Sequence, residues 1–386
     1  MATPRQRLVV ALCVLGAACT STSPPAHPDA AFLPQDVGLL VAESDGEPGG
    51  ALIEAIDPST HTLVQHSGTA FDENSRLRRI VDPRSGAERV FLVGVATGQL
   101  TEVASNGAIV SQWSVLDDGG AGQGASPRDV AIASDGAFWI TRSGLPTLRV
   151  LEPDGRPRRS VDLSAFAPPD AAPGVAGMTA IAIVGGTAYV ALARRSSAAT
   201  LPHDAQIVAI DTATYAASLF VEVPMRAPVD RFALEATDAS PRLWLACAGD
   251  ADPATHRGLV AVDVDARTVA TTFDWTSLGL SPVALAIAGT HEAFALASAS
   301  ASGGTPTTAL IGLDPGTPGA ALQTIYRSPD TPRLVDLAIA NDVVFVADGD
   351  AAAPGILVFD RFDGARRGVI STAVPPLALL VLRPPP

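Results

Sequence analysis

The chain has 386 residues, of which 47% are hydrophobic and 17% are charged, and its net charge is −14. This composition is that of a globular protein rather than a disordered or fibrous chain. A surface with this excess of acid repels phosphate backbones and anionic headgroups, so we expect no nucleic-acid partner. The excess either keeps the protein soluble or attracts cations and basic partners.

The N-terminus has the three parts of an export signal. Two arginines precede an apolar run of eleven residues, Leu8 to Ala18, which is too short to span a bilayer as a helix. The run ends in Leu15-Gly16-Ala17-Ala18-Cys19, which resembles the lipobox of bacterial lipoproteins. The resemblance implies that residues 1–18 are removed and that Cys19 is lipidated. Gly16 departs from the usual Leu, and ordinary cleavage to a free secreted protein is the alternative.

Residues 19–36 begin with the cysteine that is predicted to be lipidated and are otherwise rich in Ser, Thr and Pro. Such a segment cannot bury a core, so we expect a flexible linker to one domain over residues 37–386. The protein would then touch the membrane only through its lipid, in the bacterial cell envelope, at the outer membrane or the cell surface. Cys247 lies alone in an apolar strand-like run, so no intrachain disulfide is expected.

Seven copies of one pattern occupy the rest of the chain, each with two alternating apolar strands joined by a tight turn. The first strands of the copies begin 46 to 58 residues apart, at Leu52, Leu100, Leu148, Gln206, Leu259, Leu310 and Ile356. Two more strands precede each pair, most clearly Asp129–Ala133 and Ala137–Ile140. Seven four-stranded units predict an all-β fold, a seven-bladed β-propeller.

The ends of the repeats carry two further signals. Aspartates that would fix turns end five of the third strands, at Asp57, Asp211, Asp263, Asp314 and Asp360. The first unit begins at Val37 without an innermost strand, whereas the apolar run Leu377–Leu382 has no partner of its own. We therefore expect the C-terminal strand to complete blade one and close the ring, which removes open sheet edges.

Two segments, Tyr189–Leu192 and Ile207–Asp211, resemble the YVTN-repeat and NHL-like propellers of bacterial envelope proteins. The resemblance rests on the form of the repeat and covers about residues 37 to 382. It implies the propeller fold and, in some members, ligand or partner binding. It implies no single activity.

The loops of such a propeller divide between two faces. Turns within the first and second strand pairs, such as Ser134–Gly136 and Asn341–Asp342, are short and define a short-turn face. Loops between the second and third strands, such as residues 194–205 and 248–258, are long and define a long-loop face. Because binding residues collect in long loops on rigid scaffolds, the long-loop face is the predicted site. The same topology places Val37 and the tether on the short-turn face.

Two groups of residues on the long-loop face have the chemistry of metal ligands. Ca²⁺ prefers clustered oxygen ligands, which blades seven and one could supply from Glu43, Asp45, Glu47, Asp348 and Asp350. His203 and His256 share a repeat position in adjacent blades and could bind a transition metal. Solvated loop residues without a ligand are the commoner alternative for both groups.

Arginines supply the third candidate site. Arg128, Arg231 and Arg333 are predicted near the mouth of the central channel, where they could meet an anionic ligand. The predicted inner strands otherwise offer mostly Ala, Ile and Leu to the axis.

No known catalytic motif occurs in the sequence, neither Gly-x-Ser-x-Gly nor His-Glu-x-x-His nor Cys-x-x-Cys. We therefore expect a monomeric binding or scaffold module that engages an envelope protein or an extracellular ligand, with Ca²⁺ as the sole candidate cofactor. The alternative is a metal-assisted lactonase-like hydrolase, because lactonase propellers hold a metal at the axis.

Overall fold

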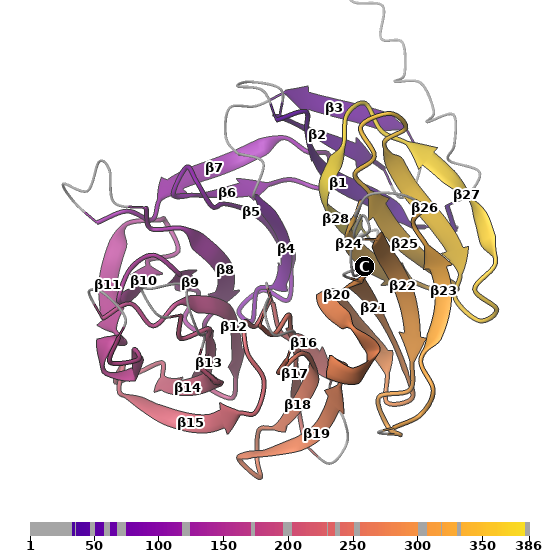
Figure 1. The fold of residues 1–386 in the computed structure, drawn as a ribbon. Helices are drawn as coiled ribbons and strands as arrows, with labels where there is room; N and C mark the ends of the chain where they lie inside the picture. Colours follow the sequence, from indigo (N-terminus) through magenta and orange to yellow (C-terminus); the bar gives the residue numbers. More distant parts are fainter. Residues whose placement is uncertain are drawn as a thin grey trace, which may run out of the picture.

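Seven antiparallel sheets of four strands form a ring around a central channel in a computed structural model (Figure 1). The structure describes residues 33–34, 36–46, 51–57, 62–67, 75–117, 124–170, 174–195, 203–229, 231–235, 240–250, 255–299, 307–317, 319–329 and 333–382. The predicted signal segment 1–18, most of the predicted linker 19–36 and Cys19 lie outside the described residues.

In each of blades one to four, the strands follow one another from the channel outward in the order given below. Blade one contains β28 (Pro376–Leu382), β1 (Gly38–Ser44), β2 (Ala51–Ile56) and β3 (Leu63–Ser67). Blade two contains β4 (Arg76–Val81), β5 (Glu88–Gly94), β6 (Gln99–Val103) and β7 (Ile109–Ser114). Blade three contains β8 (Pro127–Ile132), β9 (Phe138–Arg142), β10 (Thr147–Leu151) and β11 (Pro157–Asp162). Blade four contains β12 (Met178–Val184), β13 (Thr187–Leu192), β14 (Ala205–Asp211) and β15 (Ala217–Val223).

Blades five to seven follow the same order. Blade five contains β16 (Ala233–Glu235), β17 (Arg242–Cys247), β18 (Gly258–Asp263) and β19 (Thr268–Asp274). Blade six contains β20 (Leu280–Gly289), β21 (Glu292–Ala299), β22 (Thr307–Leu313) and β23 (Gln323–Arg327). Blade seven contains β24 (Leu334–Ala340), β25 (Val343–Asp348), β26 (Gly355–Asp360) and β27 (Arg366–Ser371). The predicted fold class is confirmed.

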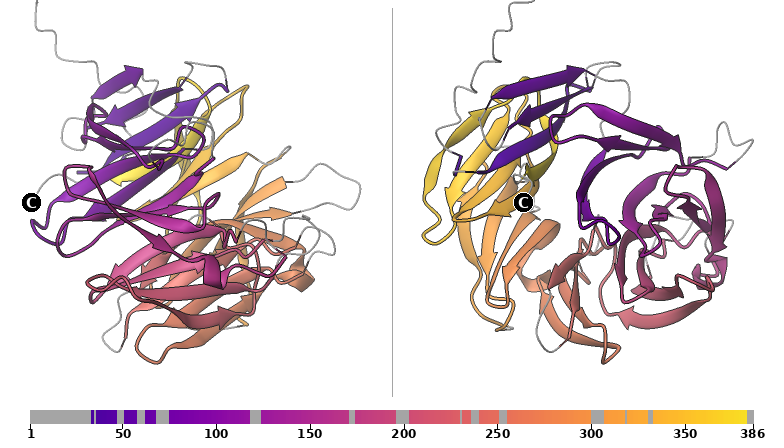
Figure 2. Two further views of the ribbon diagram at one scale, coloured as in Figure 1. Left: turned by 90° about the vertical axis from the view of Figure 1, so that its left-hand side faces the viewer. Right: turned by 180° about the vertical axis from the view of Figure 1, so that it is seen from behind.

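The ring closes through the C-terminal strand, as predicted. Strand β28 pairs antiparallel with β1, so that Gly38 lies opposite Leu382 and the N- and C-terminal ends of the ring share one blade (Figure 2). Val37 packs in one hydrophobic cluster with Ala340 and Val343, which flank the short turn of blade seven. The start of the domain therefore lies on the short-turn face, where the topology predicted it.

Hydrophobic clusters fill the spaces between neighbouring blades around the described ring. Second strands supply several of their largest side chains, among them Trp139, Trp244 and Phe345, which are at most 1% exposed. Alternation along each strand puts one set of apolar residues against each neighbouring blade, so both faces of a sheet are buried. Cys247 is a free buried thiol, as expected, and burial raises its pKa above the usual range.

Four of the predicted turn aspartates fix their turns by accepting backbone amides. Asp211 Oδ1 accepts the amides of Ala213 at 3.0 Å and Thr214 at 2.7 Å. Asp263, Asp314 and Asp360 accept amides two or three residues further on. The pKa of all four carboxyls is lowered: chiefly by these backbone amides at Asp211 and Asp263, by Arg367 and then the amides at Asp360, and at Asp314, against the effect of burial, by the Thr317 side chain and the amide of Gly316. Their role is structural.

Helical structure in the described ranges is limited to two short 3₁₀ turns, Ser164–Phe166 and Thr276–Leu278. Nothing helical in that part of the chain has the length and apolar character needed to cross a bilayer.

Candidate functional site

The central channel widens into a cavity at each end and narrows between them. The cavity on the long-loop face, here called the mouth cavity, has a volume of about 710 Å³. The cavity on the short-turn face, here called the vestibule, has a volume of about 620 Å³. A gap of about 20 Å³ shares lining residues with both cavities and marks the constriction between them.

Arginines and hydroxyls line the mouth cavity. Its polar side chains are Arg76, Arg128, Arg195, Ser143, Thr179, Ser281 and Ser298. Within the described part of the chain, the lining includes neither a carboxylate nor an aromatic ring. Arg128 Nε donates a hydrogen bond to Ser143 Oγ at 3.2 Å, which orients one guanidinium in the cavity wall. The mouth cavity therefore presents positive charge on an acidic protein.

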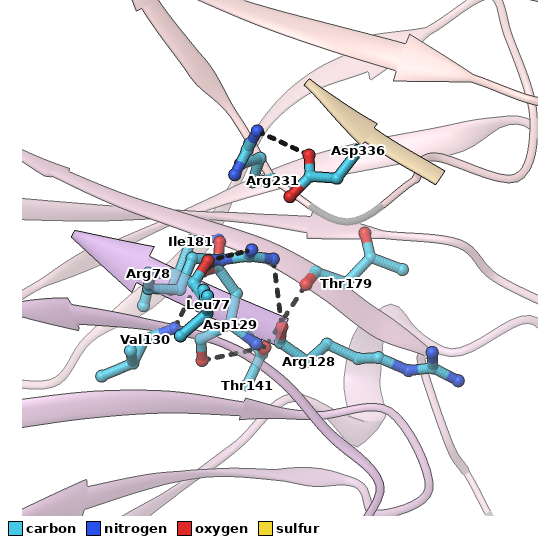
Figure 3. Close-up of polar contacts among 10 residues, drawn as sticks. All are labelled: Leu77, Arg78, Arg128, Asp129, Val130, Thr141, Thr179, Ile181, Arg231 and Asp336. Carbon is cyan, nitrogen blue, oxygen red and sulfur yellow. Dashed lines mark hydrogen bonds and ion pairs between the residues drawn. The ribbon is translucent and has the colours of Figure 1, made fainter. Parts of the chain in front are cut away.

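Bulges in the innermost strands place polar residues on the channel axis. In β8, Arg128 and Asp129 together lie opposite one residue of β9, and the innermost strands of four other blades have register shifts near the same level. A bulge re-aims the side chains on either side of it and recurs beside binding sites. Here it gives two neighbouring residues different directions, since Arg128 extends its guanidinium away from Asp129 (Figure 3).

Asp129 is buried below the mouth cavity and accepts hydrogen bonds from three blades. Its Oδ1 accepts from Arg78 Nε of blade two at 2.6 Å and from the amide of Val130 at 2.9 Å (Figure 3). Its Oδ2 accepts the amide of Ile181 in blade four at 3.0 Å. One carboxylate thus joins the innermost strands of blades two, three and four.

Asp336 repeats this arrangement in blade seven. Its Oδ1 accepts from Arg231 at 3.1 Å (Figure 3). The same oxygen accepts the amide of Leu337 at 2.9 Å, and Oδ2 accepts the amide of Leu379 at 3.1 Å. Arg231 belongs to the segment that leads into β16 of blade five, so this ion pair reaches past blade six. Together with Arg78 and Asp129, it forms a polar girdle between the two cavities.

The vestibule on the other side of the girdle is mainly apolar. All seven innermost strands contribute to it, with side chains that include Ile80, Ile132, Ile183, Leu234, Ile287, Ile339 and Leu380. Arg79 lies at its edge and donates to the carbonyl of Val381 at 3.0 Å. The vestibule therefore combines aliphatic side chains with Arg78, Arg79 and Arg231, whereas the described lining of the mouth cavity combines arginines with hydroxyls.

The three arginines predicted at the mouth have different positions. Arg128 lines the mouth cavity, and Arg231 lines the constriction. Arg333 forms an ion pair with Asp350 and is not among the described residues that line either cavity. Of the three, Arg128 is the one that the structure brings to the mouth cavity.

The expectation that the innermost strands offer mostly Ala, Ile and Leu to the axis was wrong at the level of the girdle. Sequence reasoning missed Arg76, Arg78, Asp129 and Asp336 as channel residues. The signal was present, because Asp-Val-Ala-Ile-Ala at residues 129–133 and Asp-Leu-Ala-Ile-Ala at residues 336–340 begin with the same acid at the same repeat position. An acid that recurs at the start of an innermost strand marks the girdle.

The carboxylates predicted to bind Ca²⁺ lie in different environments. Glu43 was expected in a loop, but the structure places it in strand β1, where it is fully buried. Asp45 is exposed, Asp350 pairs with Arg333, and burial raises the pKa of Asp348 above its usual range. Within the described ranges, no three His, Cys, Asp or Glu side chains are grouped to hold a metal. Glu47 lies outside those ranges, so the calcium site stays a prediction.

Each of the two predicted histidine ligands contacts a carboxylate of its own. His203 Nε2 lies 2.9 Å from Asp170 Oδ1, and His256 Nδ1 lies 3.2 Å from Asp250 Oδ2. Arg226 of the same region bridges Asp250 to a further carboxylate. These contacts form a network of polar and charged side chains on the long-loop face. The transition-metal site stays a prediction.

Comparison with known proteins gives the fold and nothing finer. No family model matches the sequence, and no curated protein matches it. Among solved structures, a putative 6-phosphogluconolactonase from Bacteroides uniformis superposes with a TM-score of 0.60 at 14% identity, covering 90% of this chain and 100% of that one. A second, from Bacteroides fragilis, has a TM-score of 0.58 at 12% identity, covering 90% and 98%. AztD from Citrobacter koseri has a TM-score of 0.52 at 13% identity, covering 90% and 98%. At such identities the shared property is the β-propeller fold.

Proposed function

We propose that this protein is a lipoprotein of the bacterial cell envelope that binds a ligand or partner through the mouth cavity on its long-loop face. The observation that carries the proposal is the cavity itself. Its volume of about 710 Å³ lies within the range of small-molecule sites, and rigid strands rather than loops supply its arginines at residues 76 and 128. A site built on strands is held in a fixed geometry and needs little ordering to bind.

The position of Val37 supports the envelope part of the proposal. Residue 37 lies on the short-turn face, so a lipid on Cys19 would tether that face to the membrane. The mouth cavity opens on the opposite face and would point toward ligands or partners. A monomer would serve this arrangement, because the ring leaves no sheet edge open at its closure.

Replacement of the proposed lipid acceptor tests the tether. We expect Cys19→Ala to move the protein from the membrane fraction to the soluble fraction, because a polar linker alone has no affinity for a bilayer. Fractionation of cells that express the native chain and the variant measures this. Cys247→Ala is the matched control and should stay with the membrane. A Cys19→Ala protein that still sediments with membranes would show that the anchor lies elsewhere.

A bulky residue in the cavity wall tests the binding face. Ser298 lines the mouth cavity, and we expect Ser298→Trp to occupy part of it and to reduce strongly the capture of envelope components by the purified protein. Asp154→Trp in an exposed turn on the short-turn face is the control. Equal capture by the native protein and by Ser298→Trp would reject the mouth cavity as the binding site.

A second candidate is a lactonase-like hydrolase, which the likeness to the two Bacteroides proteins, both putative 6-phosphogluconolactonases, favours. That function would need a metal in the channel, because lactonase propellers hold a metal at the axis. Metal analysis of the purified protein and an assay with a simple lactone separate the candidates. One bound ion per chain together with lactone hydrolysis would favour the enzyme.

A further inference from the structure

We infer that the mouth cavity binds a small, non-aromatic oxyanion, either a carboxylate or a phosphate, with Arg76, Arg128 and Arg195 as the residues that hold it. The inference rests on the proposed function, because it concerns the same cavity, and it names the chemistry of the ligand. Four observations carry it: the charge of the lining, the arrangement of that charge, the lack of ring partners and the floor of the cavity.

The charge of the lining is opposite to that of the whole protein. The chain has 40 acidic and 26 basic residues, yet the described residues around this cavity include three arginines and no acid. A concave site with low-dielectric walls concentrates the field of such charges, so an anion is drawn to the mouth from an otherwise repulsive surface. Guanidinium groups also match carboxylate and phosphate oxygens in pairs.

The arginines come from three consecutive blades and lie on one side of the axis. Arg76 is in β4 of blade two, Arg128 is in β8 of blade three, and Arg195 follows β13 of blade four. Blade six contributes hydroxyls instead, from Ser281 and Ser298. The cavity therefore has a cationic side and a neutral hydrogen-bonding side, which suits a ligand with an anionic group at one end and neutral polar groups at the other.

Aromatic rings are missing from the lining within the described ranges, so a flat base or ring would find no stacking partner there. The polar girdle forms the floor. Asp129 and Asp336 hold Arg78 and Arg231 in ion pairs at the constriction, where the gap of about 20 Å³ has room for about one water molecule. These two facts favour a compact aliphatic or inorganic anion that enters and leaves by the mouth.

Calorimetric titration of the purified mature protein tests the inference with defined probes. We expect succinate or inorganic phosphate to bind, and succinamide, the uncharged isostere of succinate, to bind at least tenfold more weakly. Comparing the succinate and phosphate arms decides between a carboxylate and a phosphate ligand. Affinity for the preferred anion should fall as sodium chloride is raised, because screening weakens the attraction.

Variants of the arginines locate the site. Arg76→Gln and Arg128→Gln should each weaken binding of the preferred anion at least tenfold, while Arg128→Lys should retain part of it. Arg156→Gln removes the same charge from an exposed turn on the other face and should leave the affinity unchanged. Melting temperatures of all four variants separate a loss of binding from a loss of folding.

Two results would overturn the inference: equal binding of succinate and succinamide, or anion binding that the arginine variants leave intact. Neither result touches the proposed function, which fails if Ser298→Trp captures envelope components as well as the native protein does. If Ser298→Trp impairs capture but the native protein binds neither succinate nor phosphate, the proposed function stands and the oxyanion inference fails.

Discussion

A chain that ends at Val374 is expected to lose its cooperative fold, although only twelve residues are removed. The deletion removes β28, whose apolar residues from Ala378 to Leu382 are at most 8% exposed and pack against blades two and seven. Burial of each large apolar side chain stabilises by about 1.5–3 kcal/mol. Four such side chains are comparable to the whole stability of a typical domain, about 5–15 kcal/mol.

The deletion also removes polar links between blades. Asp336 would lose the amide of Leu379, and Arg79 would lose the carbonyl of Val381. Strand β1 would become an open edge that could pair with other chains.

Thermal unfolding followed by circular dichroism, with size-exclusion chromatography, measures the effect of the deletion. The truncated chain should be insoluble or should melt far below the native protein. A chain that ends at Leu382 keeps β28 and is the matched control, which should melt like the native protein. Equal melting of all three chains would mean that the ring closes without its C-terminal strand.

The sequence was sufficient to predict the architecture because the same strand pattern occurs seven times along the chain. Alternating apolar residues predicted the start of the third strand to within one residue in six blades, as in Gln206–Asp211 against β14 (Ala205–Asp211), and to within three residues in blade six, where β22 begins at Thr307. Blade one lacked an inner strand and the C-terminal strand lacked a blade, so the C-terminal strand was predicted to complete blade one. Seven weak strand patterns at a regular spacing predict the repeat fold more strongly than any single pattern does.

The innermost strand of blade two was predicted to exist but was not located in the sequence, and the reason is physical. Strand β4 reads Arg-Leu-Arg-Arg-Ile-Val and lacks the apolar alternation of its counterparts. Its charge is tolerated because Arg78 meets Asp129, which lies 51 residues away in the sequence. From the sequence alone, a buried arginine looks like a surface residue, because its acidic partner is not close to it in the chain. The arrangement of the blades around the ring brings the two together.

A related error concerned Glu43. Its neighbours Asp45 and Glu47 suggested an acidic loop, yet β1 continues to Ser44 and carries Glu43 into the space between blades one and seven. Glu54 on the adjacent strand β2 faces the same way and is 2% exposed. The alternation of β1 is consistent with this burial, but a carboxylate at a core position is rare enough to be assigned to the surface.

Glu43 and Glu54 form a pair that is expected to make stability depend on pH. Burial, reinforced by the neighbouring carboxyl of Glu54, raises the pKa of Glu43 to about 9, despite the amide of Val374 donating to its Oε2 at 3.1 Å. At neutral pH the folded protein therefore holds Glu43 protonated, with one carboxyl of the pair able to donate to the other. The unfolded chain ionises the same group near its ordinary value of 4.5.

The sign follows from this difference. Between about pH 4.5 and 9 the folded state binds one more proton than the unfolded state, so unfolding releases a proton and becomes easier as pH rises. The contribution of Glu43 to stability is complete below pH 4.5 and is lost as pH rises through 9, at about 1.4 kcal/mol per pH unit.

Glu43→Gln is the sharpest test, because an amide has the shape of a protonated carboxyl but cannot ionise. Its NH₂ group can donate to Glu54, and its carbonyl oxygen can accept the Val374 amide. We expect the variant to match the native protein near pH 4.5 and to exceed its free energy of unfolding by a few kcal/mol at pH 8. Urea unfolding of both proteins across pH 4.5–9 gives this difference directly.

Glu88→Gln, which removes a carboxylate at an exposed position, is the control and should show no growing difference from the native protein with pH. The opposite result for Glu43→Gln, a loss of stability at pH 8, would mean that the native carboxylate is ionised and held by a cation. In that event added Ca²⁺ should raise the melting temperature of the native protein and leave that of Glu43→Gln unchanged, which would support Glu43 as a ligand of the calcium site that the sequence predicted.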